Sequence, residues 1–149
     1  MYKMYNGRGG GKRAAATGSV MKKLKVKKGN IIVTENSEGD EMYVVTSGKV
    51  KIYKTINQEK VHLAVLGKNA FFGEMCLLLG TPRTATVEAV EETELLALTK
   101  ESLLKKIKTD PAFAERMLLT MAKRLKQADE IISKLEGEKR SLEVIYGAK

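Results

Sequence analysis

Residues 72 to 86 hold the side chains whose chemistry is easiest to interpret, in the order Phe-Gly-Glu-Met-Cys-Leu-Leu-Leu-Gly-Thr-Pro-Arg-Thr-Ala-Thr. Gly73 permits close backbone approach, and Glu74 can accept hydrogen bonds from the hydroxyl groups of a sugar. Arg83, nine residues after Glu74, offers a planar set of N–H donors to phosphate oxygens. The N–H groups that open a short apolar helix after Gly73 also favour an anion. Together these groups predict a site that holds a sugar and a phosphate side by side.

This segment closely resembles the phosphate-binding cassette of cyclic-nucleotide-binding domains, the family found in protein kinase A regulatory subunits, the bacterial catabolite activator and cyclic-nucleotide-gated channels. The resemblance covers about three-quarters of the chain, from about Leu24 to Leu135. A Gly-Glu or Pro-Arg pair alone would be weak evidence, but the ordered set at family spacing is strong. Outside the cassette, the matching segments are Ile32 to Lys54, with Glu35, Gly39-Asp40, Tyr43-Val44-Val45 and Ser47-Gly48-Lys49-Val50, and then Leu63 to Gly67.

The resemblance implies a role for each cassette residue. Arg83 is expected to bind the two exocyclic oxygens of a cyclic phosphate, and Glu74 to accept from the ribose 2′-hydroxyl. Backbone N–H groups of Cys76 and Thr84 are expected to complete the cradle. The alternatives are a surface charge at Arg83 and, at Glu74, an acid that stabilises a helix N-terminus. The expected ligand-binding set is Gly73, Glu74, Met75, Cys76, Arg83, Thr84 and Ala85.

Other residues are expected to face the sugar or the base, namely Ile52, Leu63, Leu66, Arg124, Ala128 and Asp129. The three apolar residues are candidates for a wall of the site, and ordinary core packing is an equal alternative. Arg124 resembles the helix arginine that approaches the cassette, with a solvated charge as its alternative. A hydroxyl at Thr84 and a carboxylate at Asp129 are associated with cGMP in the family, but both also suit cAMP. The implied ligand is therefore cAMP or cGMP, and no other cofactor is expected.

Two departures from the family pattern concern the region before the cassette. The usual Glu-Gly-Asp turn is replaced by Glu35-Asn36-Ser37, and asparagine tolerates a left-handed backbone better than most residues. We therefore expect this turn to be retained. The helical segment that usually precedes the first strand has no counterpart in Met1 to Val20.

Enzymatic and metal chemistry find little support in the composition. A metal-dependent cupin would share the β-roll pattern, but its site needs two or three histidines, and the chain has only His62. Cys76 is the single cysteine, so it cannot form an internal disulfide, and a nucleophile there would need a nearby base. No catalytic triad, paired-cysteine metal spacing or P-loop is present. We expect a binding protein that is neither an enzyme nor a metalloprotein.

Short apolar segments separated by turn residues predict the elements that position the cassette. The expected strands are Leu24–Val26, Ile31–Val33, Met42–Val45, Val50–Ile52, Val61–Leu66, Ala85–Val87 and Leu95–Leu98. Their close spacing favours a mainly β fold, a double-stranded β-helix or jelly-roll-like β-roll. A short helix over Lys100 to Ile107 and a long one starting at Asp110-Pro111 are expected to follow, and Gly137 is the expected end of the long helix.

The long helix carries apolar residues at coiled-coil spacing: Leu118, Met121, Leu125, Ala128, Ile132 and Leu135. The stripe is about 26 Å long at 1.5 Å per residue, which is long for a helix covered by so small a barrel. We therefore expect a parallel homodimer through this helix, with packing on the β-roll as the alternative. Leu142, Val144 and Ile145 are expected to form a short tail helix.

Charge is distributed unevenly along the 149 residues, which carry a net charge of +9. Residues 1 to 30 hold nine Lys or Arg and no acid, whereas the remainder holds 18 bases and 18 acids. We expect a flexible, basic, glycine-rich tail over 1–20, a β-roll domain over 21–109, and a lid and dimerisation helix with its tail over 110–149. The tail is either a solubilising segment without a partner or a contact for nucleic acid, an anionic membrane or an acidic partner.

The hydrophobic content of 43% includes no run long enough to span a membrane and no secretory signal, so we expect a cytoplasmic protein. The predicted function is a cyclic-nucleotide sensor domain. The alternatives are a DNA-associated regulator that acts through the basic arm, and a dimerisation module that binds no ligand.

Overall fold

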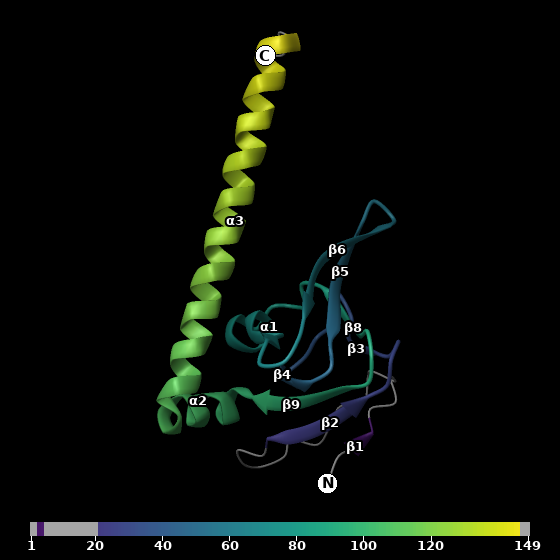
Figure 1. The fold of residues 1–149 in the computed structure, drawn as a ribbon, viewed down its shortest axis with the longest axis vertical. Coiled ribbons are helices and arrows are strands. Elements are labelled where there is room, and N and C mark those ends of the chain that lie inside the picture. Colours follow the sequence, from purple (N-terminus) through teal and green to yellow (C-terminus); the bar gives the residue numbers. More distant parts are fainter. Residues whose placement is uncertain (1–2, 5–20, 147–149) are drawn as a thin grey trace. The chain divides into compact units, whose positions relative to one another are not determined.

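A computed structural model describes residues 3–4 and 21–146 of the chain (Figure 1). Within these residues, a five-stranded sheet has the strand order β1-β2-β9-β4-β7 and a four-stranded sheet has the order β3-β8-β5-β6. All neighbouring strands are antiparallel except β1 and β2. The strands are β1 (Lys3–Met4), β2 (Lys22–Val26), β3 (Ile31–Val33), β4 (Glu41–Ser47), β5 (Val50–Ile56), β6 (Glu59–Leu66), β7 (Phe71–Phe72), β8 (Thr86–Ala89) and β9 (Thr93–Thr99).

The predicted fold class, a mainly β roll followed by helices, is confirmed. Each of the seven predicted strand segments overlaps a strand of the structure. The main difference is in β5, which continues to Ile56 rather than ending at Ile52. The sequence analysis missed β7 because two residues are too short to show an alternating pattern, although β7 joins β4 directly before the cassette.

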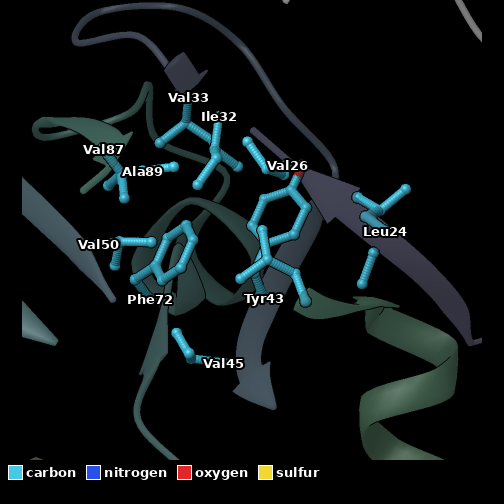
Figure 2. Close-up of a cluster of buried hydrophobic side chains, with 12 residues drawn as sticks. Leu24, Val26, Ile32, Val33, Tyr43, Val45, Val50, Phe72, Val87 and Ala89 are labelled. Carbon is cyan, nitrogen blue, oxygen red and sulfur yellow. The ribbon is translucent and has the colours of Figure 1, made fainter. Parts of the chain in front are cut away.

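A hydrophobic core lies between the two sheets and includes side chains from both (Figure 2). Alternation along the strands places these side chains inward. In β2, for example, Leu24 and Val26 are buried while Lys23 is exposed. The core cluster consists of Leu24, Val26, Ile32, Val33, Tyr43, Val45, Val50, Phe72, Val87, Ala89, Leu95 and Ala97. Tyr43 in β4 and Phe72 in β7 thus belong both to the core and to the strands beside the cassette.

Three helices follow the predicted order: α1 (Glu74–Leu79), α2 (Lys100–Thr109) and α3 (Pro111–Tyr146). Figure 1 shows the short helix α1 beside β4. At the start of α2, Thr99 Oγ1 accepts a hydrogen bond of 3.2 Å from the Ser102 N–H. At the start of α3, Asp110 Oδ1 accepts one of 3.1 Å from the Phe113 N–H. The predicted start of α3 at Asp110-Pro111 is therefore confirmed.

The predicted end of the long helix at Gly137 is wrong, because α3 continues through it to Tyr146 and has 36 residues. A glycine inside a helix costs only about 1 kcal/mol relative to alanine. Good helix formers on both sides, among them Glu136, Glu138 and Lys139, offset that cost. Ser141 Oγ also donates a 3.0 Å hydrogen bond to the Gly137 carbonyl. The expected tail helix over residues 142–145 is therefore part of α3.

The chain divides into two compact units, Met1–Lys105 and Lys106–Lys149. The first contains both sheets, α1 and the first part of α2, and the second contains the end of α2 and all of α3. The domain boundaries expected from the sequence stay a prediction. Apart from Lys3–Met4, the tail expected over residues 1–20 lies outside the described residues.

Candidate functional site

Two glycines delimit the cassette helix α1. Gly73, directly before it, has a φ of 85° and Gly80, directly after it, has a φ of 67°, both in the left-handed region. The Gly80 N–H donates to the Cys76 carbonyl at 3.0 Å, which closes the last turn. The six residues of α1 therefore form a compact turn whose N-terminal N–H groups follow directly after Gly73.

Arg83 lies inward against the start of this turn. The residue is 5% exposed, and its Nη1 donates to the Gly73 carbonyl at 3.4 Å. Its guanidinium carbon is 5.8 Å from the centre of the Tyr43 ring, which itself stacks on Phe72 at 5.2 Å. These contacts hold a planar cation beside α1. The alternative of a surface charge at Arg83 is therefore wrong.

The backbone of Arg83 is fixed by the loop between β3 and β4. Its N–H donates to the Ser37 carbonyl, and its carbonyl accepts from the Asn36 N–H, both at 2.8 Å. Asn36 has a φ of 65°, so the expectation that the Glu35-Asn36-Ser37 turn keeps a left-handed residue is confirmed. The turn matters for the site because it is bonded directly to the arginine.

Two features of the structure favour glycine at position 73. Its positive φ is unfavourable for residues with a Cβ atom. In addition, a Cβ atom at this position would lie 2.6 Å from Arg83 Nη1 and 3.3 Å from the Glu41 carbonyl oxygen. The sequence analysis expected Gly73 to permit close approach of its backbone. In the structure, the group that lies close to this backbone is the Arg83 guanidinium.

The other cassette residues differ in their exposure. Glu74 and Cys76 are buried, and the Cys76 thiol donates a 3.1 Å hydrogen bond to the Gly39 carbonyl. Met75 and Thr84 are exposed, and Ala85 is half-buried. The structure brings Arg83 against Gly73 at the start of this turn, and the contact of the cassette residues with a ligand stays a prediction.

The apolar residues expected to face the sugar or base separate into two groups. Ile52 and Leu66 pack against the core cluster, on the same face of the sheet as Val50. Leu63 is 52% exposed and is the extra residue of a β-bulge, because Ile52 pairs with Ala64 while the next residue of β5 pairs with His62. The bulge, which nothing in the sequence signals, sets Leu63 apart from the other two.

Three predicted residues belong to α3 in the second unit, namely Arg124, Ala128 and Asp129. Arg124 is half-buried, whereas Ala128 and Asp129 are exposed. Their expected approach to the base stays a prediction. The sequence analysis gave no role in the site to Ser37, Gly39 or Tyr43, since only the fold places them against Arg83.

The described part of the chain also limits other kinds of site. Among residues 3–4 and 21–146, no group of three or more His, Cys, Asp or Glu side chains could hold a metal ion. No helix in the same residues is both long enough and apolar enough to span a membrane.

Comparison with known proteins shows which family has this cassette. The family model described as "Cyclic nucleotide-binding domain" matches residues 23–110, from the second residue of β2 to the residue that caps α3. The chain belongs to the cyclic nucleotide-binding domain family. Strands β3 to β9, α1, the buried Arg83 and the two glycines of the cassette all fall inside the matched region of this cyclic nucleotide-binding domain.

Several relatives of this cyclic nucleotide-binding domain are known. The Cyclic AMP receptor protein of Thermus thermophilus is 38% identical over 119 residues, which are 79% of this chain and 55% of that protein. The cAMP-dependent protein kinase type II regulatory subunit of Drosophila melanogaster is 34% identical over 63% of this chain and 24% of its own length. The crystal structure of the Thermus thermophilus Catabolite Activator Protein matches with a TM-score of 0.71 and 36% identity, over 78% of this chain and 55% of that one.

The chain spans about half the length of the first curated relatives that it matches, 55% of one and 49% of the next. The family model accounts for residues 23–110 of the chain.

Proposed function

We propose that this domain binds a cyclic purine nucleotide, cAMP or cGMP, and acts as a regulatory sensor rather than as an enzyme. The observation that carries the proposal is the buried Arg83, held against Gly73 at the start of α1. A guanidinium in a fixed orientation can bind two oxygens of one phosphate, and its burial strengthens such charge-assisted bonds.

The neighbouring residues suit the rest of the ligand. Backbone N–H groups of α1 and of Thr84 would complete the phosphate site, and Glu74 would accept from the ribose 2′-hydroxyl. Ile52 and Leu66 lie on the core face of the four-stranded sheet and would contact the sugar or base. We expect α3 to supply Arg124, Ala128 and Asp129 to the same ligand.

Solved relatives support both nucleotides. Structures of the EAL enzyme Bd1971 have been described in a cAMP-bound form and in a cGMP-bound form, at 32% and 33% identity to this chain. A cAMP-bound structure named PfPKA-R is 40% identical over 58% of this chain. The proposal therefore names the class of ligand and leaves the choice of base to experiment.

Calorimetric titration of the purified chain with cAMP, with cGMP and with cyclic dinucleotides tests the proposal. We expect saturable binding of cAMP, cGMP or both, and weaker or no binding of the larger dinucleotides. The linear monophosphate 5′-AMP is the matched control, because it carries the same sugar and base without the cyclic phosphate. Absence of binding by both cyclic mononucleotides would contradict the proposal and favour a structural role.

We also propose that the chain forms a homodimer through α3. Four apolar residues of the predicted stripe are at least half exposed: Leu118, Leu125, Ile132 and Leu135. A second copy of the same helix would cover them at coiled-coil spacing, which removes apolar surface from water. Since the stripe repeats over several turns of one helix, a parallel copy matches it along its whole length.

Sedimentation analysis of a variant with lysine at both Leu125 and Ile132 tests the dimer. We expect the parent to sediment as a dimer and the variant as a folded monomer, because like charges would face one another across the seam. The matched control places lysine at Gln127 and Ser133, which are exposed residues of α3 outside the stripe. This control adds the same two charges to the same helix and should stay dimeric. If the parent protein is monomeric at high concentration, the proposed dimer is contradicted.

A further inference from the structure

The loop between β3 and β4 contains a glycine, Gly39, that touches the side chain of Arg83. A Cβ atom at Gly39 would collide with Arg83 Nη2, and it would lie 2.6 Å from Nε and 2.7 Å from Cζ. All three atoms belong to the guanidinium, which therefore rests directly on the backbone of Gly39. Gly39 is not among the described glycines with a positive φ, so its backbone alone does not require glycine.

The same loop is also hydrogen-bonded to the cassette helix α1. The Cys76 thiol in α1 donates a 3.1 Å hydrogen bond to the Gly39 carbonyl. Cys76 is buried, and so is Arg83. One peptide segment thus contacts both the cassette helix and the arginine.

We propose that Gly39 and Cys76 are positioning residues for Arg83. Gly39 provides a flat surface on which the guanidinium lies, and the Cys76 thiol holds this surface against α1. Neither side chain is required to touch the ligand. The inference rests on the proposed function, since positioning of Arg83 matters for binding only if Arg83 binds phosphate.

The contact between Gly39 and Arg83 predicts that a substitution at Gly39 would alter the position of the guanidinium rather than the fold. The atoms that a Cβ at Gly39 would meet are the far end of a flexible side chain, so the guanidinium can move and the backbone can stay in place. The fold should therefore be preserved while the guanidinium is displaced. A displacement of about 1 Å in a binding group can cost up to about a hundredfold.

Gly39→Ala tests the inference, with Gly67→Ala as the matched control. A Cβ at Gly67 would meet no described atom within 4 Å, and Gly67 is not among the described glycines with a positive φ. We expect Gly39→Ala to weaken cAMP and cGMP binding by about tenfold to a hundredfold, and Gly67→Ala to bind as the parent does. Thermal unfolding should give nearly the same midpoint for all three proteins.

A double-mutant cycle distinguishes positioning of Arg83 from a general structural effect. In an Arg83→Ala background, Gly39→Ala should cause no further loss of affinity, because the group that it displaces is absent. An equal loss with and without the arginine would overturn the inference, and so would parent-like affinity in Gly39→Ala.

The Cys76 side of the inference has its own variants. Cys76→Ala removes the thiol donor and should weaken binding by about twofold to fivefold, whereas Cys76→Ser keeps a donor and should bind within about twofold of the parent. If Gly39→Ala does not fold, the two Cys76 variants still test the inference. Equal nucleotide affinities of Cys76→Ala and Cys76→Ser would contradict the role of the thiol.

A measurement without nucleotide separates this inference from the proposed function. The NMR signal of the Arg83 side-chain Nε–H can be assigned by its loss in Arg83→Ala. We expect this signal to shift in Gly39→Ala and to stay in place in Gly67→Ala. If the parent binds no cyclic nucleotide, the proposed function fails while the shift still supports the contact. An unshifted signal in Gly39→Ala would overturn the positioning role whatever the parent binds.

Discussion

Replacement of Arg83 by alanine separates the binding role of this residue from its structural role. Within the protein its side chain makes a long hydrogen bond, 3.4 Å to the Gly73 carbonyl, and lies 5.8 Å from the Tyr43 ring centre. The long hydrogen bond stabilises the fold by about 0.5–1 kcal/mol and the buried ring contact by about 2 kcal/mol, so the loss of stability should be about 3 kcal/mol at most. With phosphate bound, two charge-assisted bonds of about 1.5–3 kcal/mol each would be lost. The expected affinity loss is therefore about 3–6 kcal/mol, a hundredfold or more.

Titration calorimetry and thermal unfolding of the same samples measure the two quantities together. Arg116→Ala is the matched control, because it removes the same charge from an exposed position of α3. We expect this control to bind like the parent. Unchanged affinity in Arg83→Ala would refute the assignment of the phosphate site. A large loss of stability would instead show that the arginine is needed mainly for the fold.

Three further predictions concern the ribose, the base and a helix cap. Glu74→Gln should reduce the preference for the parent ligand over its 2′-deoxy analogue in competition binding, and an unchanged preference would contradict the hydroxyl contact. Thr84→Ala should weaken cGMP by about 1–3 kcal/mol with little effect on cAMP, and Asp129→Ala should weaken cGMP as well. Equal losses for both nucleotides would rule out a role in base choice. The hydrogen bond from the Phe113 N–H, and then the charge of Lys106, lower the pKa of Asp110 from 3.8. The ionised Asp110 therefore contributes its full stabilisation of the fold above pH 3.8. In circular dichroism melts, the parent should unfold at a higher midpoint temperature than Asp110→Ala. This difference in midpoint should disappear as the pH falls through the lowered pKa of Asp110.

Local sequence signals predicted the parts of the fold that depend on local chemistry. The start of α3 follows from Asp110-Pro111, since an acid that caps a helix and a proline in its first turn act within a few residues. The left-handed conformation at Asn36 follows from the tolerance of asparagine for positive φ. The cassette was found because its groups lie within fifteen consecutive residues, from Phe72 to Thr86.

Contacts between distant segments had no such signal. Gly39 and Tyr43 precede Arg83 by about forty residues, and only the sheet pairing places them beside it. The bulge at Leu63 depends on the register between β5 and β6, which the alternating pattern does not determine at a single residue. The error at Gly137 has a different origin. A glycine was interpreted as a helix end, although its small cost is offset when strong helix formers follow it.

The contact between Arg83 and its two glycines also limits how the sequence can evolve. Every missense change at Gly39 or Gly73 adds a Cβ atom, and at both positions that atom would lie within 2.6 Å of the guanidinium. Neither position has a conservative substitute while the arginine is present. If the arginine were lost first, Gly39 would become free to vary, whereas Gly73 would still be restricted by its positive φ. Descendants that have lost Arg83 should therefore lose the glycine at 39 before the glycine at 73.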